Sequence, residues 1–376
     1  MTAFLNKVKG LVNVDFFIFL PIIILYLFSI LTLYDFTDNR FFVKQVIFGL
    51  IGITAYIFTS RIDFSFLKNT KIIMSLYGFS LFLLVLTLIV GENINGAKAW
   101  LNLGLFSFQP ADFVKLVLII LLAKYFSRRH VEIKFLRHIV TSLFYIILPI
   151  LIIMKQPDLG SAIVIAFIWL FVVILAGMSK KHIIIFLIMG IIGSIMMWNF
   201  ALKPYQKNRV LDFVNPMRDI QGSGYNVYQA LVAIGSGGAT GKDVGFGTQS
   251  KLHFLPEHET DFIFSAFAEE WGFVGVLILL SLYFIILARV LYIAYISHDN
   301  FFAIISLGVF AWIFVHAFIN ISMNMGLFPV TGLPLPFMSY GGSHILMLCL
   351  ALGMVSSFVS SKKNINKKHY TEFLGY

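Results

Sequence analysis

The acidic residues around the start of one apolar run are the first candidates for chemistry. Glu257 and Asp261 directly precede a run that begins at residue 262, and Glu269 lies two turns inside it. A carboxylate at such a place can act as a general base, or it can cap the helix that begins there. At helical spacing, Asp261 and Glu269 share a stripe with the small Ser265 and Ala268, which would leave room beside the acid. Glu269 could instead pair with another helix, so the residues alone leave both alternatives open.

A second candidate is the pair formed by Asp112 and Lys115. The two residues are three apart in an apolar run that follows Pro110, a residue suited to the first turn of a helix. Charges inside a bilayer are costly unless they are buried in protein or face a wet cavity, and they usually serve a function. The pair could bind an anionic group, or it could be self-satisfied and only orient its helix.

Two short segments carry turn residues. Residues 155–161 read KQPDLGS, a composition that by itself favours a plain turn around Asp158. Residues 235–243 read GSGGATGKD and resemble a nucleotide phosphate loop. Ser236 stands where that loop needs a Gly, and Asp243 stands where a Ser or Thr must follow the Lys. We therefore exclude a phosphate loop and expect the glycines to permit tight turns.

Polar and Pro-rich features mark the last two apolar runs. His316 and Asn320 are four residues apart, a spacing that favours a polar contact between helices. Residues 326–342 hold Pro329, Pro334 and Pro336 among several glycines, so they cannot form a regular helix and must be buried in protein or line a cavity. No His, Cys or carboxylate cluster has the spacing of a dedicated metal site.

The elements that position these residues are predicted to be membrane helices. The chain has 376 residues, 59% apolar and only 12% charged, with 41 Phe. A soluble domain carries roughly twice that charged fraction, so a soluble enzyme is excluded. Runs of about 20 apolar residues indicate membrane spans. Ten are found, at about 15–35, 41–60, 72–91, 109–126, 138–155, 160–178, 182–201, 262–288, 301–325 and 340–360.

The net charge of +10 is interpreted as a topology signal, not as a nucleic-acid footprint. With the N-terminus in the cytoplasm, 17 of the 28 Lys and Arg residues lie on the inner side, 10 on the outer side, and Lys115 lies inside a span. We therefore predict an all-α polytopic membrane protein of ten transmembrane helices with both termini cytoplasmic. Residues 1–376 form one integral membrane domain, in which residues 202–261 form a long extracytoplasmic loop between helices seven and eight.

Several motifs together resemble those of the SEDS family (shape, elongation, division and sporulation). They are spread in order over most of the chain: QPADFVKL at 109–116, QPDLG at 156–160, LPE at 255–257, TDFIF at 260–264, GLFPVTGLPLP at 326–336 and SYGGS at 339–343. Within the family, residues 222–226, 234–238 and 247–252 resemble the rod-elongation branch, RodA, more than the division branch. The chain departs from the usual family pattern at Ala99, Asp112, Glu259 and His344.

This resemblance implies a peptidoglycan glycosyltransferase of the bacterial cytoplasmic (inner) membrane. Its substrate would be lipid II, an undecaprenyl diphosphate-linked disaccharide peptide, and its partners a class B penicillin-binding transpeptidase, other elongation-complex proteins and membrane lipid. The resemblance also moves Asp261 from a helix cap to the expected general base. The expected substrate-binding residues are Gln109, Asp112, Lys115, Asp158, Lys98, Trp100, Lys207, Arg209 and Glu257.

The expected reaction is an inverting single displacement, because the donor is an α-linked sugar diphosphate and the family product is β-linked. The diphosphate leaves without strong acid help, so cations must stabilise its charge. A divalent cation, Mg²⁺ or Mn²⁺, could bridge the diphosphate and the carboxylates, although no cofactor is fixed by the sequence. Two alternatives remain: a transporter (flippase) for the lipid-linked precursor, which would also carry intramembrane charges and broken helices, and a non-enzymatic scaffold of the elongation complex.

Overall fold

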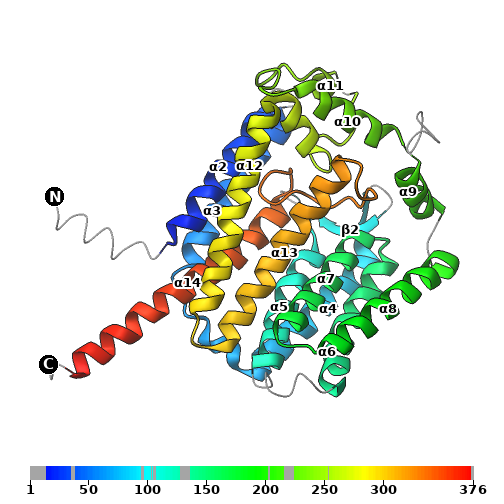
Figure 1. Ribbon diagram of the computed structural model, residues 1–376. Helices are drawn as coiled ribbons and strands as arrows, with labels where there is room; N and C mark the ends of the chain where they lie inside the picture. Colours follow the sequence, from blue (N-terminus) through cyan, green and yellow to red (C-terminus); the bar gives the residue numbers. More distant parts are fainter. Residues whose placement is uncertain are drawn as a thin grey trace, which may run out of the picture.

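The protein is a bundle of long helices (Figure 1). The computed structural model describes residues 14–34, 39–94, 97–102, 104, 107–127, 136–201, 204–215, 224–252 and 254–373. Each of the ten predicted spans coincides with a helix. These helices are α2 (Phe16–Tyr34), α3 (Asn39–Thr59), α4 (Thr70–Val90), α5 (Pro110–Ser127), α6 (Leu136–Lys155), α7 (Leu159–Leu175), α8 (Lys180–Met196), α12 (Ile263–Ile296), α13 (Asn300–Asn324) and α14 (Gly342–Phe373).

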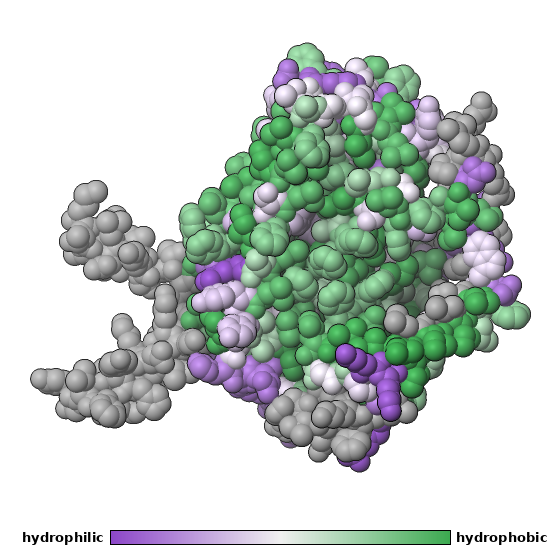
Figure 2. All heavy atoms as spheres, viewed as in Figure 1, coloured by the Kyte–Doolittle hydropathy of each residue, from purple (hydrophilic) through white to green (hydrophobic). Residues whose placement is uncertain are grey.

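The helices make this a multi-pass membrane protein. Among the residues described, seven helices are long and apolar enough to cross a membrane: α2, α3, α4, α6, α12, α13 and α14. α7 is a shorter apolar helix, and α5 holds Asp112, Lys115 and Lys124 within its 18 residues. Figure 2 shows apolar side chains over the middle of one face, with polar residues gathered near its upper and lower edges. Seven of the basic residues behind the predicted orientation lie outside the described residues: Lys7, Lys9, Arg128, Arg129, Lys134, Lys203 and Arg218.

The connections between the spans contain regular structure that the prediction of an all-α protein lacked. Between α4 and α5, a small antiparallel sheet has the order β1 (Glu92–Ile94), β2 (Ala97–Asn102) and β3 (Ser107–Phe108). Its register pairs Glu92 with Trp100 and Leu101 with Phe108. The predicted loop 202–261 contains α9 (Pro204–Val214), α10 (Tyr225–Gly237) and α11 (Thr248–Lys251). Two short helical turns, η1 (Phe64–Lys68) and η2 (Met197–Ala201), complete the elements of the described residues.

α13 lies at the centre of the bundle, where it packs against α12, α5 and α7 (Figure 1). Trp312 and Val309 of α13 and Ile119 of α5 are fully buried. Gly308 lets the two helices approach, because a Cβ there would lie 2.5 Å from the Ile119 side chain. α14 packs on α3 and α2 packs on α12 around this centre.

The Pro-rich segment between α13 and α14 is irregular, as the sequence predicts, and its second half, residues 333–339, is largely buried in protein. Leu335, Phe337 and Met338 are at most 1% exposed. The backbone groups of the segment find side-chain partners from several helices: the Met338 carbonyl accepts from Ser29 Oγ at 2.5 Å, and the Pro336 carbonyl accepts from the Tyr283 hydroxyl. Irregular backbone at membrane depth is therefore tolerated, because side chains of the surrounding helices supply hydrogen-bond partners for its polar groups.

α12 is interrupted at Gly272, whose φ of 63° and ψ of −166° are not helical. The backbone N–H groups of Phe273 and Val274 donate instead to the carbonyls of Gly238 and Ala239, at 3.0 and 3.1 Å. The glycine-rich segment excluded as a phosphate loop thus supplies the hydrogen bonds that the broken helix lacks. We call this contact, made by residues 237–242 against residues 268–274, the glycine crossing.

The glycine crossing predicts opposite outcomes for two substitutions in one segment. Gly241 has a φ of +87°, and a Cβ there would lie 2.0 Å from the Glu270 carbonyl oxygen, so Gly241→Ala is expected to lower the thermal midpoint and to make residues 238–252 more sensitive to protease. Gly235 is helical with open space around its Cβ position, so Gly235→Ala is the matched control and should be tolerated. Equal thermal midpoints and equal protease sensitivity for the two variants would show that the glycine crossing does not require a glycine at residue 241.

Candidate functional site

Asp261 lies in a run of turns directly before α12. Its backbone N–H donates to the Glu257 carbonyl at 3.1 Å, and the N-cap of α12 is Phe262, which makes no side-chain cap hydrogen bond. The interpretation of Asp261 as a helix cap is therefore wrong. No described residue donates a hydrogen bond to its carboxylate. Its Oδ2 faces Gly332, 3.5 Å from the position a Cβ would take there.

The surroundings of Asp261 raise the pKa of its carboxyl group to about 6. Burial is the main cause, because it disfavours the charged form, and the negative charge of Glu257 adds to it. The guanidinium of Arg209, from α9, acts in the opposite direction. Arg209 is fixed beside the Pro-rich segment, since its Nη1 donates to the Val330 carbonyl at 3.3 Å. Asp261 is thus a carboxylate tuned toward neutral pH, which a general base requires.

Two amides of α13 hold the backbone of Asp261. Nδ2 of Asn320 and Nδ2 of Asn324 both donate to the Asp261 carbonyl oxygen, at 3.0 and 2.9 Å. The sequence pattern singled out Asn320 as a polar contact but missed Asn324. The i, i+4, i+8 spacing of His316, Asn320 and Asn324 on one face of a buried helix is the signal that could have found it.

Glu269 and Glu270 are both buried, and the α10–α11 region supplies hydrogen-bond partners for both. Glu269 accepts from Lys242 Nζ at 2.9 Å and from the backbone N–H of Gln249 at 3.1 Å. Glu270 Oε1 accepts from the backbone N–H of Gly245 at 2.7 Å. The two glutamates therefore fasten the α10–α11 region to α12, and the expected pairing with another helix is replaced by pairing with the loop.

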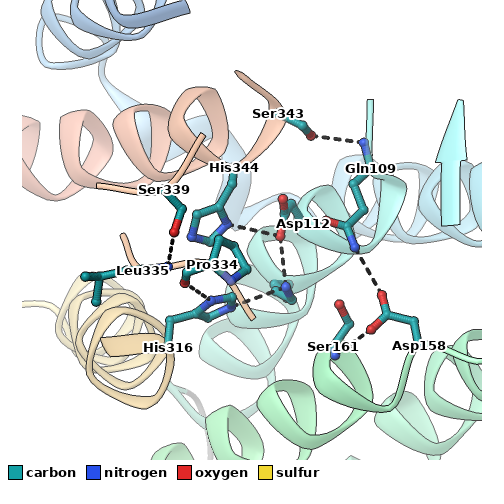
Figure 3. Close-up of polar contacts among 11 residues, drawn as sticks. Gln109, Asp112, Asp158, Ser161, His316, Pro334, Leu335, Ser339, Ser343 and His344 are labelled. Carbon is teal, nitrogen blue, oxygen red and sulfur yellow. Dashed lines mark hydrogen bonds and ion pairs between the residues drawn. The ribbon is translucent and has the colours of Figure 1, made fainter. Parts of the chain in front are cut away.

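The second candidate pair lies in a buried polar cluster of four residues (Figure 3). Lys115 Nζ donates to Asp112 Oδ1 at 2.8 Å, and both side chains are 1% exposed. Lys115 Nζ also lies 3.3 Å from His316 Nε2, and His344 Nδ1 lies 3.4 Å from Asp112 Oδ1. We call Asp112, Lys115, His316 and His344 the buried cluster. Two departures from the family pattern, Asp112 and His344, meet in it.

Gln109 and Asp158 lie beside the buried cluster and link two helix starts (Figure 3). Gln109 Nε2 donates to Asp158 Oδ2 at 3.0 Å. Asp158 caps α7, because its Oδ1 accepts from the backbone N–H of Ser161 at 2.9 Å. The expected turn at residues 155–161 is confirmed, and its Asp has a second role in positioning Gln109. The backbone N–H of Gln109 donates in turn to Ser343 Oγ at 3.0 Å.

The Pro-rich segment connects Asp261 with the buried cluster. Ser339 Oγ donates to the Thr260 carbonyl at 2.6 Å and accepts from the Leu335 backbone N–H at 2.8 Å. One residue earlier, the Pro334 carbonyl lies 3.3 Å from His316 Nδ1. The two groups of candidate residues are therefore linked through backbone, with no hydrogen bond or ion pair between Lys115 and Asp261 in the described part of the chain.

The remaining predicted substrate-binding residues lie at the periphery. Lys98 is exposed on β2, and Trp100 is half-buried opposite Glu92 in the sheet. Lys207 of α9 lies 5.9 Å from the Trp198 ring centroid, as a cation–π contact. Among the described residues there is no group of three His, Cys, Asp or Glu side chains that could hold a metal ion.

Comparison with known proteins matches nearly the whole chain. The family model for cell cycle proteins of the FtsW, RodA and SpoVE type matches residues 10–364. The peptidoglycan glycosyltransferase MrdB of Escherichia coli (strain K12) is 39% identical over 292 residues, 78% of this chain and 79% of the relative. The Stage V sporulation protein E of Bacillus subtilis (strain 168) is 37% identical over 325 residues, 86% of this chain and 88% of the relative.

A solved structure has the same fold. It is described as "Structural coordination of polymerization and crosslinking by a peptidoglycan synthase complex", and it superposes with a TM-score of 0.82 at 30% identity, covering 93% of this chain and 98% of that chain.

Proposed function

The chain belongs to the FtsW/RodA/SpoVE (SEDS) family, and from this premise we propose that it is a peptidoglycan glycosyltransferase that polymerises lipid II. The names of its relatives support the reaction class. The observation that carries the catalytic assignment is the Asp261 carboxylate. It lies at the start of α12 without a hydrogen-bond donor among the described residues, and its pKa is raised to about 6.

Asp261 is the general base in this proposal. It removes the proton from the acceptor sugar hydroxyl as that oxygen attacks the anomeric carbon of the donor. The bond from that carbon to the diphosphate oxygen breaks, and the lipid diphosphate leaves with the electron pair. Because the attack and the departure occur on opposite faces of the sugar, an α-linked donor gives a β-linked strand. A carboxylate with a pKa near the working pH is a more effective base than one at its usual value.

Cations around Asp261 would stabilise the departing diphosphate. Arg209 is the best placed of these cations, because its positive charge is close enough to Asp261 to lower the pKa of that carboxyl group. Lys207 and Lys98 are proposed to contribute further positive charge. Glu257, Trp100, Gln109, Asp112 and Asp158 are proposed as further substrate contacts. Lys115 is enclosed by Asp112 and His316, so its contact with the substrate stays a prediction. The described residues do not form a metal cluster by themselves, so no step is assigned to a metal, and a bridging Mg²⁺ or Mn²⁺ also stays a prediction.

The proposed setting is the bacterial cytoplasmic membrane, with ten spans and both termini inside. Asp261 and the α9–α11 region would then face the outer side, where lipid II is polymerised. The likeness to a peptidoglycan synthase complex supports a class B penicillin-binding transpeptidase as the partner. The RodA-like residues 222–226, 234–238 and 247–252 support a proposed role in cell elongation, together with other elongation-complex proteins and membrane lipid.

The pH dependence of polymerisation tests this proposal. The rate should rise with pH through about 6 and level above it, because only the ionised Asp261 can accept the proton. The measurement is the initial rate of glycan strand formation from lipid II by the purified protein with its transpeptidase. The product also distinguishes a glycosyltransferase from a transporter, because a transporter would move lipid II across a liposome membrane without forming glycan. A rate that does not change around pH 6, or the absence of glycan product, contradicts the proposal.

A further inference from the structure

The backbone of Asp261 is held more firmly than its side chain. The carboxylate has no hydrogen-bond donor among the described residues, yet the carbonyl oxygen of the same residue accepts two side-chain amides. Hydrogen bonds donated to the carboxylate would lower its pKa, so contacts made to the backbone position this acid without weakening it as a base.

Asn324 connects this backbone to the first turn of α12. Its Nδ2 donates to the Asp261 carbonyl at 2.9 Å, and its Oδ1 accepts from the Ser265 backbone N–H at 3.1 Å and from Ser265 Oγ at 2.7 Å. The first N–H groups of a helix need acceptors, and Phe262 offers none from its side chain. Asn324 thus gives the Ser265 N–H a second acceptor from α13, beside the Phe262 carbonyl at 3.1 Å.

Asn320 connects the same carbonyl to the Pro-rich segment. Its Nδ2 donates to the Asp261 carbonyl at 3.0 Å and to the Leu333 carbonyl at 2.8 Å. Leu333 follows Gly332, the residue that faces Asp261 Oδ2. The Asn320 amide therefore fixes the distance between the Asp261 backbone and the Leu333 backbone, next to the Gly332 that the carboxylate faces. Asn320 and Asn324 are both fully buried.

We propose that Asn320 and Asn324 are positioning residues for Asp261, which hold its backbone so that the carboxylate stays partly buried and free to accept a proton. The inference rests on the proposed role of Asp261 as the base. A side-chain hydrogen bond between membrane helices contributes on average only about 0.6 kcal/mol to the free energy of unfolding. Displacing a reacting group by about 1 Å can lower the rate about 10²-fold. The effect on catalysis should therefore exceed the effect on folding.

The test compares Asn320→Leu and Asn324→Leu with Ser306→Ala as the matched control. Ser306 is also buried on α13, but among the described residues its hydroxyl bonds only to its own helix, at the Phe302 carbonyl. For the Leu variants, kcat for lipid II is expected to fall about 10–100-fold with KM changed by less than about threefold. The acid limb of the pH profile should move below 6, because water reaches the carboxyl group of a loosened turn. Hydrogen exchange should accelerate at residues 257–265 but not at residues 300–312.

The outcomes separate this inference from the base assignment. If Asp261→Asn, measured in parallel, keeps its activity, the base assignment fails. If Asp261→Asn is inactive while the Leu variants keep the wild-type acid limb and the wild-type exchange at residues 257–265, only the positioning role is overturned. A fall in kcat with an unshifted acid limb also overturns it. If the Leu variants do not fold, Asn320→Gln and Asn324→Gln decide by the same two readouts, with smaller expected shifts.

Discussion

Asp261→Asn is expected to lower the rate of lipid II polymerisation about 10²–10⁴-fold, because the variant cannot take the proton from the acceptor hydroxyl. The protein should remain folded and at least as stable as the wild type at neutral pH. The pKa of this acid is raised to about 6 in the folded chain, so its ionised form is disfavoured by folding, and a neutral amide removes that penalty. The measurements are the rate of glycan formation and the thermal midpoint.

Two neighbours serve as matched controls for the base assignment. Glu257 raises the pKa of Asp261, so Glu257→Gln should move the acid limb of the rate profile to lower pH. Arg209 lowers that pKa, so Arg209→Gln should move the limb to higher pH. Opposite shifts would identify Asp261 as the titrating group. Near-wild-type polymer from Asp261→Asn would show that another group removes the proton.

Lys115→Met is expected to be the most destabilising of the substitutions considered. It leaves the carboxylate of Asp112 buried with the more distant His344 ring as its one remaining side-chain partner among the described residues, and breaking a buried ion pair in this way costs about 3–5 kcal/mol. Activity should fall with it, because the substitution also removes the polar contact that joins Lys115 of α5 to His316 of α13. Thermal unfolding of the purified protein measures the first effect and glycan formation the second.

The double variant Asp112→Asn/Lys115→Met shows whether the ion pair is needed for activity or only neutralises its own two charges. It removes both charges and should recover most of the stability. Recovered stability without recovered activity would assign the pair to function, whereas recovery of both would show that it only orients α5. The ion pair of Lys68 and Asp299 is the control, because both side chains are 40% exposed and Lys68→Met should cost under about 1 kcal/mol. A Lys115→Met protein as stable as Lys68→Met would contradict the argument.

The sequence predicted the helices and the positions of the unusual residues, because both depend on local pattern. Apolar run length located the ten long helices but not α9, α10 and α11, and the prolines of residues 326–342 predicted an irregular segment. The end of α12 was missed by eight residues, since the predicted run stopped at 288 and the helix continues to Ile296. The length of an apolar run does not mark where a helix ends.

The contacts of the site could not be predicted, because they join segments far apart in the chain. The pKa of Asp261 depends on burial and on Arg209 from α9, and its backbone depends on Asn324, 63 residues away. His344 carried no signal in the sequence and is found against Asp112. Run length and spacing describe one helix at a time, whereas burial and pairing are properties of the assembled bundle.

The break in α12 also bears on how the protein enters the membrane. The part after Gly272, Phe273–Ile296, has about 24 residues and spans roughly 36 Å, which exceeds the hydrocarbon thickness of a bilayer. Its only charged residue is Arg289, so the translocon can insert it as an ordinary apolar span. Glu269 and Glu270 lie before the break, so neither carboxylate has to be transferred into lipid during biogenesis. They can be buried later, when the α10–α11 region folds down onto α12.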